Sequence, residues 1–235
     1  VIAVKGGRVS RLLLHPSLPL VAVAQRAELT VWDYSAQATA PVARFANHGA
    51  GGGRVAYMAL VNPGAEAPQL LTATDGGGVR VWRDWCSPHG PKLTTAFNAV
   101  DDPPAIAPLG GAPRGALALW TQRRGHLFAC SRSAAGPVVQ VWDLASERCA
   151  QRLLAGPDGG DVHITALAEV ATPFSPALLA AGASDGSVRV YDLRAGAYAC
   201  HALVCDRGAA VVGLQAHLDG EAPAGAGARA DLVSG

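Results

Sequence analysis

A short strand-forming segment recurs four times along this chain, and its spacing constrains the fold more than any other feature. The copies are ELTVWDY at 28–34, GVRVWRD at 78–84, VVQVWDL at 138–144 and SVRVYDL at 187–193. Each copy ends on or just after one large aromatic ring, and the four rings are Trp32, Trp82, Trp142 and Tyr191. These rings are 50, 60 and 49 residues apart. A nearly constant period of this length indicates a repeat architecture.

Each copy is preceded by two further strand-like segments and followed by a more polar one. In the first repeat these are RVSRLLLHP at 8–16, LPLVAVA at 18–24 and APVARFANH at 40–48. Four short strands in every repeat, without helical periodicity, are typical of the blade of a β-propeller. We therefore predict an all-β fold. The expected blades span about 8–48, 54–97, 115–155 and 162–204, and a half blade spans 209–235.

The half blade holds two strand-like segments only, so the chain is expected to form about four and a half four-stranded blades of a larger propeller. An open propeller exposes the apolar faces of its terminal blades as well as their strand edges. We therefore expect these 235 residues on their own to aggregate.

A tight turn leads into the third strand of two repeats. The second repeat has Asp75 followed by three glycines, and the fourth has Asp185 and Gly186. Glycine adopts a positive φ without a steric cost, and an aspartate can hydrogen-bond the backbone of its own turn. The aromatic ring at the end of the strand is expected to fill the wedge between neighbouring blades.

The composition excludes several classes of function. The formal net charge is +1, which does not favour binding to nucleic acid or to anionic lipid. No apolar run approaches the roughly 18 residues that span a membrane. The five cysteines, at 86, 130, 149, 200 and 205, are odd in number and form no C-x-x-C pair. Neither a disulfide framework nor a zinc site is therefore expected, and a reducing, intracellular compartment is favoured. We expect Cys130 to be a small core residue.

Two motifs imitate reactive sites. GASDG at 182–186 matches the G-x-S-x-G nucleophile elbow of hydrolases, but Ser184 is followed by a strand-forming segment instead of the helix that the elbow requires. His201, with Cys200 and Cys205, could supply half of a metal site, which is too few ligands. We expect a hairpin turn and an outer strand at these places, and neither a catalytic nor a metal site.

Three other polar features favour structural readings. The glycine-rich segment at 49–54 lacks the G-K-[ST] ending that binds phosphate, and it reads as a loop between blades. Asp101 and Asp102 precede two prolines and read as part of a solvated connection. His15 is expected to form a hydrogen bond in a turn or between strands. We therefore expect no cofactor and no small-molecule substrate.

Two levels of resemblance follow from these motifs. Three of the repeated strands resemble the strand endings of WD-repeat propellers, whose usual number of blades is seven. These endings are the VWD segments that contain Asp33 and Asp143 and the VYD segment that contains Asp192. In the second copy Arg83 takes the place of the aspartate. Four longer segments resemble the C-terminal propeller of the raptor family. They are LLTATDGGGVRVWRDW at 70–85, PKLTTAFNAV at 91–100, ALWTQRRGHLFACS at 118–131 and VVQVWDLASERCAQRL at 138–153.

The raptor resemblance implies a non-enzymatic scaffold within the target-of-rapamycin (TOR) kinase complex, TOR complex 1. It implies the other subunits of that complex and nutrient-sensing GTPases as partners, and a role in substrate recruitment and in growth signalling that responds to nutrients. The implied location is the cytoplasm, with recruitment to the surface of the lysosome or vacuole. The alternative is a general WD-repeat adaptor in another complex, such as a ubiquitin ligase or a trafficking complex. A catalytic propeller ranks last, since no carboxylate or histidine recurs at equivalent blade positions.

One segment stands out as a place for contacts. Residues 86–114 lengthen the second spacing to 60 residues, and long loops on a rigid scaffold often carry binding residues. A tolerated insertion is the favoured reading, with PKLTTAF at 91–97 as an outer strand.

Overall fold

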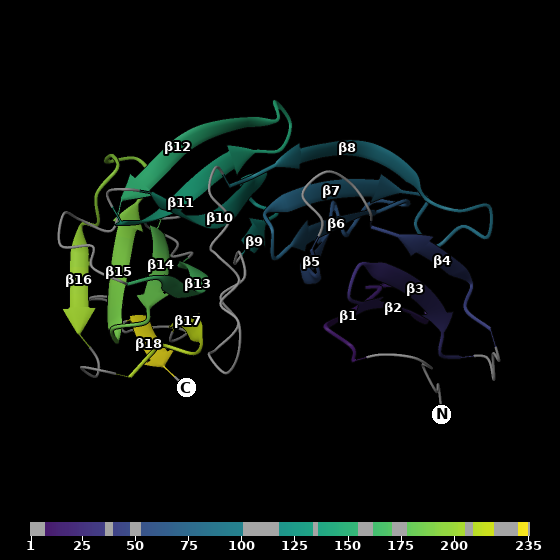
Figure 1. The fold of residues 1–235 in the computed structure, drawn as a ribbon, viewed down its shortest axis with the longest axis horizontal. Coiled ribbons are helices and arrows are strands. Elements are labelled where there is room, and N and C mark those ends of the chain that lie inside the picture. Colours follow the sequence, from purple (N-terminus) through teal and green to yellow (C-terminus); the bar gives the residue numbers. More distant parts are fainter. Residues whose placement is uncertain are drawn as a thin grey trace, which may run out of the picture. The chain divides into compact units, whose positions relative to one another are not determined.

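The computed structural model describes residues 8–35, 40–47, 53–100, 118–133, 136–154, 162–170, 178–204, 209–218 and 230–234 (Figure 1). These residues contain β-strands and no helix. They form four four-stranded sheets and one two-stranded sheet. The predicted all-β fold is confirmed, because each repeat builds one sheet in which the strands follow one another in chain order.

The chain divides into two compact units, Val1–Gly125 and His126–Gly235. The first unit holds two complete sheets, ordered β1-β2-β3-β4 and β5-β6-β7-β8, and the strand β9. Their bounds are β1 Arg11–Leu14, β2 Leu20–Gln25, β3 Glu28–Asp33, β4 Ala43–Ala46, β5 Val55–Val61, β6 Gln69–Thr74, β7 Gly78–Arg83, β8 Lys92–Asn98 and β9 Ala118–Thr121.

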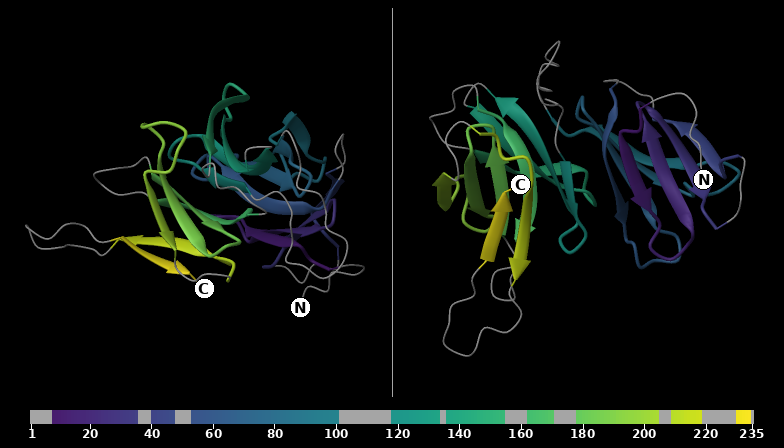
Figure 2. Two further views of the ribbon diagram at one scale, coloured as in Figure 1. Left: turned by 60° about the vertical axis from the view of Figure 1, so that its left-hand side comes forward. Right: turned by 90° about the horizontal axis from the view of Figure 1, so that it is seen from below.

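The second unit holds the remaining strands. The third sheet is ordered β12-β11-β10-β9, the fourth is ordered β13-β14-β15-β16, and β17 pairs with β18 in an antiparallel hairpin (Figure 2). The bounds are β10 His126–Ser133, β11 Gly136–Asp143, β12 Arg148–Leu154, β13 Ile164–Val170, β14 Leu178–Ala183, β15 Ser187–Asp192, β16 His201–Val204, β17 Leu214–Leu218 and β18 Ala230–Ser234.

The two middle strands of a sheet are buried on both faces. In β2 and β14 the buried positions are filled mainly by alanine and other small apolar residues, such as Ala22, Ala24, Ala180 and Ala181, all fully buried. A strand covered on both faces has no polar side, so its sequence lacks the alternation of a half-exposed strand. The outer strands differ, since β8 and β16 are largely exposed.

Aromatic side chains pack the first sheet of unit one against the second. The ring of Phe45 in β4 lies 5.2 Å from the ring of Trp82 in β7. His15, in the turn after β1, stacks on the fully buried Trp85 with 5.6 Å between the ring centroids. The anchor ring Trp82 belongs to the same core cluster as Leu29 and other residues of the first sheet.

Contacts between sheets also run along their first strands. In unit one β1 contacts β5, and β5 contacts β9; in unit two β13 contacts β17. The first sheet thus packs on the second and the fourth on the β17–β18 hairpin, as neighbouring units of a repeat protein do.

The start of the last repeat differs from the expected strand. In the half blade expected at 209–235, the first strand, β17, begins only at Leu214. The described residues before it are held by the fourth sheet: the Val211 N–H donates to the Ala183 carbonyl at 3.1 Å, and the Thr165 hydroxyl donates to the Val211 carbonyl at 2.6 Å. These bonds direct the backbone of Val211 toward the fourth sheet before β17 starts.

Candidate functional site

Three of the four aromatic anchors are buried in the sheets, and the fourth, Trp142, is partly buried. Trp32, Trp82 and Tyr191 are less than a tenth exposed. The indole N–H of Trp32 donates to the Thr30 hydroxyl at 3.0 Å, and that of Trp82 donates to the Thr72 hydroxyl at 3.2 Å. A buried indole needs such an acceptor. These rings therefore hold the sheets together and do not present a binding surface.

The same pattern recurs in the third sheet with a different acceptor. The indole N–H of Trp142 donates to the side-chain carbonyl of Gln140 at 3.4 Å, two residues earlier on the same strand. In the first sheet the acceptor Thr30 also lies two residues before its ring. Residues i and i−2 of a strand share one face, so Trp32 and Trp142 each bond a residue of their own strand, whereas Trp82 bonds Thr72 on β6.

A buried hydrogen-bond network ties the end of the first repeat to the second sheet. The Thr72 hydroxyl donates to the Asn47 side-chain carbonyl at 3.0 Å, and the guanidinium of Arg80 donates to the Asn47 backbone carbonyl at 3.1 Å. Asn47, Thr72 and Arg80 are all less than a tenth exposed. Sequence reasoning did not identify this network, because Asn47 carries no motif and its partners are 25 and 33 residues away.

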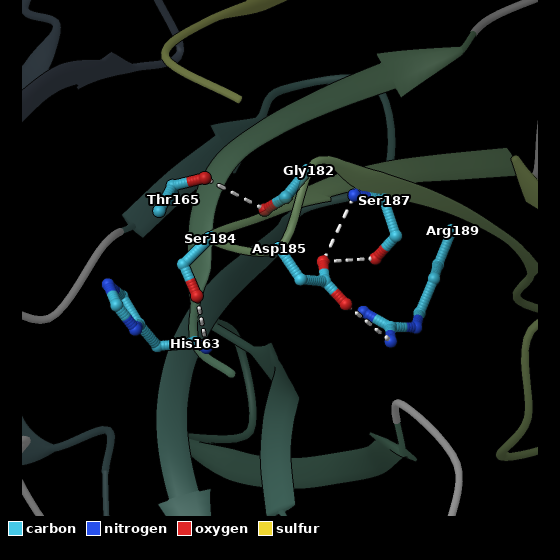
Figure 3. A network of polar contacts seen from close by, with 7 residues as sticks. All are labelled: His163, Thr165, Gly182, Ser184, Asp185, Ser187 and Arg189. Atoms are coloured by element: carbon cyan, nitrogen blue, oxygen red, sulfur yellow. Dashed lines mark hydrogen bonds and ion pairs between the residues drawn. The ribbon is translucent and has the colours of Figure 1, made fainter. Parts of the chain in front are cut away.

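A polar cluster of the fourth sheet surrounds the turn between β14 and β15 (Figure 3). The Asp185 carboxylate accepts hydrogen bonds from the Ser187 N–H at 3.0 Å and from the Ser187 hydroxyl at 2.6 Å, and it pairs with Arg189 at 3.8 Å. Gly186 has φ of 79°. Partial burial raises the pKa of Asp185, but the bonds from Ser187 and the charge of Arg189 outweigh this and lower it below its ordinary value.

Ser184, the serine of the G-x-S-x-G motif, joins this turn to the start of the sheet. Its hydroxyl accepts a hydrogen bond from the His163 N–H at 3.1 Å, and its N–H donates to the His163 carbonyl at 2.9 Å (Figure 3). The next regular element is the strand β15 and not a helix. The strand–turn–helix geometry of a hydrolase elbow is therefore absent, and Ser184 serves as a turn residue.

The second sheet contains the same pair of hydrogen bonds between a turn residue and the start of the sheet, with an aspartate in place of the serine. The Asp75 carboxylate accepts a hydrogen bond from the Arg54 N–H at 2.7 Å, and the Asp75 N–H donates to the Arg54 carbonyl at 2.9 Å. The register supports this equivalence, since Leu70 faces Trp82 as Leu179 faces Tyr191. Asp75 thus corresponds to Ser184 and not to Asp185, although both aspartates are followed by glycine.

The aspartates after the anchor rings stabilise exposed turns. Asp33 accepts hydrogen bonds from the N–H and hydroxyl of Ser35 at 2.8 and 2.7 Å. In the third sheet the side-chain hydrogen bond from Ser146 is the main cause of the lowered pKa of Asp143. Asp192 binds the Arg194 guanidinium at 2.7 Å. Each carboxylate is engaged by residues two or three positions later, as in Asx turns.

The buried ionisable groups of unit two are poor candidates for chemistry at neutral pH. Desolvation raises the pKa of Tyr191 to about 12, and burial raises the pKa of the Cys130 thiol as well. Both groups are therefore neutral, and a buried neutral thiol is a weak nucleophile. Cys130 lies in the core, as its small size and apolar neighbours in the sequence predicted.

Other positions singled out from the sequence fall into two groups. His15 is a turn acceptor, since its Nδ1 accepts hydrogen bonds from the N–H groups of Ser17 and Leu18 at 3.2 and 3.1 Å. Cys200 and His201 lie at an exposed outer strand. Several candidates lie outside the described residues: Cys205, Asp101, Asp102, the stretch 49–52 and the part of 86–114 from 101 onward.

Within the described ranges, no group of three His, Cys, Asp or Glu side chains is placed to bind a metal ion. The same part of the chain contains no helix that is long and apolar enough to cross a membrane. Of the segment 86–114, the described part includes β8, which is the outer strand of the second sheet.

Comparison with known proteins relates this geometry to one family. No family model matches the chain. It is 31% identical over 183 residues, 77% of its length, to Regulatory-associated protein of TOR 1 from Arabidopsis thaliana, and 30% identical over 199 residues to Protein raptor homolog from Dictyostelium discoideum. The crystal structure of Chaetomium thermophilum Raptor superposes with a TM-score of 0.71 over 89% of the chain. The chain therefore matches raptor proteins over most of its own length.

The matched region is a small part of the raptor relatives. The chain spans 12% of the length of the Arabidopsis and Dictyostelium proteins, and 18% of the Chaetomium chain. The Chaetomium match, at 22% sequence identity, supports the fold: four-stranded antiparallel sheets of the WD-repeat propeller type. The predicted raptor resemblance and fold class are therefore confirmed.

Proposed function

We propose that this chain is a scaffold module of a raptor-type subunit of TOR complex 1. The observation that supports this most strongly is the match to the plant and amoebal raptor proteins over 77% and 83% of the chain. A relative from Saccharomyces cerevisiae, 29% identical over 175 residues, is named Target of rapamycin complex 1 subunit KOG1. The module would support assembly of the complex, recruitment of substrates and nutrient-responsive control of growth.

We propose further that the module has no enzymatic activity. In the described residues the polar groups that imitate catalytic residues are engaged in the fold: Ser184 binds the backbone of His163, and Asp185 binds Ser187. The buried Tyr191 and Cys130 stay neutral at physiological pH because burial raises the pKa of each. A propeller module whose described polar groups are engaged in this way is suited to docking.

The proposed partners are the TOR kinase, the other subunits of TOR complex 1 and nutrient-sensing GTPases. The proposed location is the cytoplasm, with recruitment to the lysosomal or vacuolar surface when nutrients are present. These two proposals rest on the family resemblance. Imaging of the tagged parent protein beside an organelle marker, in fed and starved cells, tests the location. A distribution that does not change with nutrients would contradict recruitment.

Affinity purification of the tagged full-length parent protein from its own cells tests the scaffold role. Mass spectrometry is expected to recover the TOR kinase and its small propeller subunit, in amounts close to that of the tagged protein. An identically tagged, unrelated WD-repeat protein is the control. Recovery of ubiquitin-ligase or trafficking subunits without the kinase would refute the TOR assignment and leave the general WD-repeat adaptor as the function.

A further inference from the structure

The outer strand of the fourth sheet exposes an unusual surface. β16, His201–Val204, pairs with β15 along one edge, and no described strand pairs with its other edge (Figure 1). All four of its residues are exposed; Leu203 is 52% and Val204 is 58% exposed. Neighbouring residues of a strand point to opposite faces, so β16 presents an apolar side chain on each face, beside a backbone edge with which no described strand pairs.

The other three outer strands carry charged residues. β4 contains Arg44, which pairs with Glu28 at 3.2 Å; β8 contains Lys92, which pairs with Asp84 at 3.5 Å; and β12 contains Arg148 and Arg152. Proteins commonly protect an edge strand from pairing with other chains by placing charges on it. β16 contains no Lys, Arg, Asp or Glu. Among the fourth strands of the four repeats (β4, β8, β12 and β16), it is therefore the one without this protection.

The backbone leading into β16 is held in place. The Leu154 N–H, at the end of β12, donates to the Ala197 carbonyl at 2.6 Å, and Leu154 forms an isolated parallel bridge with Tyr198. The Cys200 N–H donates to the Val190 carbonyl at 2.8 Å. Tyr198 is 65% exposed and extends the apolar surface at the start of the strand. A fixed edge loses little conformational freedom when it binds a partner.

We propose that β16 binds an extended, uncharged segment of a partner protein as a fifth strand of this sheet. Alternate N–H and C=O groups of β16 point away from β15 and can pair with the backbone of the added strand. The lack of charge on β16 favours an uncharged partner, because a charged segment would lose hydration beside Leu203 and Val204 and find no opposite charge on that strand. The proposal does not depend on membership of TOR complex 1.

A labelled peptide tests this proposal on the full-length parent protein. The probe is a fluorescein-labelled heptapeptide of alternating valine and threonine, and its binding is followed by fluorescence anisotropy. The control probe is the same peptide with N-methyl groups on alternate residues, which removes the N–H donors of one edge. We expect the first peptide to bind and the methylated peptide to lose binding by about tenfold or more.

Two protein variants separate edge binding from general adhesion to apolar surface. The double variant Leu203→Lys, Val204→Lys gives β16 the charges that protect the other outer strands, and is expected to weaken binding by about tenfold or more. The matched control is Leu93→Lys, because Leu93 is 49% exposed on the outer strand β8. Binding to this control should equal binding to the wild type. Both variants change exposed side chains, and thermal unfolding checks that each remains folded.

Several results would overturn the proposal. These are failure of the wild-type protein to bind the peptide, equal binding of the methylated peptide, and equal binding by the double variant. A fourth is a concentration-dependent dimer that the double variant abolishes, since the edge would then pair with a second copy of this chain. Slower hydrogen exchange of residues 201–204 when the unmethylated peptide is added would support it.

Discussion

The hydrogen bond between the Arg54 N–H and the Asp75 carboxylate joins the start of β5 to the turn after β6, and its contribution to stability can be measured. The carboxylate is 12% exposed, accepts the Arg54 N–H at 2.7 Å and forms a longer ion pair with the half-exposed Arg54 guanidinium at 3.5 Å. A hydrogen bond to a charged group contributes about 1.5–3 kcal/mol, whereas an exposed ion pair contributes about 0–1 kcal/mol. We therefore expect Asp75→Ala to lower the local stability at the start of β5 by about 2 kcal/mol.

Asp75→Ser is the informative partner of this variant. In the fourth sheet Ser184 occupies the equivalent position and accepts the His163 N–H at 3.1 Å. A serine at position 75 would keep an acceptor for the Arg54 N–H, so it should cost about 1 kcal/mol or less.

Hydrogen exchange of the peptide covering residues 53–61 in the full-length protein measures the effect. A loss of about 2 kcal/mol corresponds to roughly 30-fold faster exchange of the protected amides. Asp33→Ala is the control, because Asp33 binds Ser35 within an exposed turn of the first sheet and should leave this peptide unchanged. If the serine variant exchanges as fast as the alanine variant, or if neither differs from the wild type, the equivalence of Asp75 and Ser184 is refuted.

Two further predictions concern packing and pH. A Cβ at Gly182 would lie 2.5 Å from Val211 Cγ1, so Gly182→Ala should destabilise unit two by about 1–3 kcal/mol. A Cβ at Gly213 would meet no atom within 4 Å, so Gly213→Ala should be tolerated. Equal shifts of the thermal unfolding midpoint in the two variants would contradict this. Desolvation lowers the pKa of His15, so folding favours the neutral imidazole over the imidazolium. The neutral ring therefore contributes its full stability to the folded state above pH 6.5, and this contribution is lost as the pH falls below that value and the ring becomes protonated. The protection factors of the turn amides within 15–20, which allow for the pH dependence of intrinsic exchange, should therefore fall between about pH 7.5 and 5.5. His15→Asn, which keeps an acceptor, should remove that fall.

Much of the fold could be predicted from local sequence features. The spacing of Trp32, Trp82, Trp142 and Tyr191 gave the repeat, and the short apolar segments between turn residues gave the strands. These signals are local, because a strand buried on both faces must be apolar whatever its neighbours are. The family resemblance could also be recognised, since the segments between the anchors contain residues typical of raptor proteins.

The polar contacts could not be predicted in the same way. Matching the two Asp-Gly dipeptides would align Asp75 with Asp185. In the structure the positive φ falls on Gly77 in the second sheet and on Gly186 in the fourth, at 85° and 79°. These two glycines are therefore equivalent, and the aspartates are one position apart. Which residue adopts the left-handed conformation depends on strand register, and register depends on how the whole sheet packs.

The sequence by itself determined the repeat, the strand order within each repeat, the positions of the aromatic anchors and the family resemblance. These features depend on the period of the chain and on the identity of single residues. Only the tertiary structure decided that Asn47 joins Thr72 and Arg80, that Ser184 binds the backbone of His163, and that β16 is an unprotected edge. Hydrogen-bond partners and exposed edges depend on which distant segments meet, and no local pattern of residues encodes that meeting.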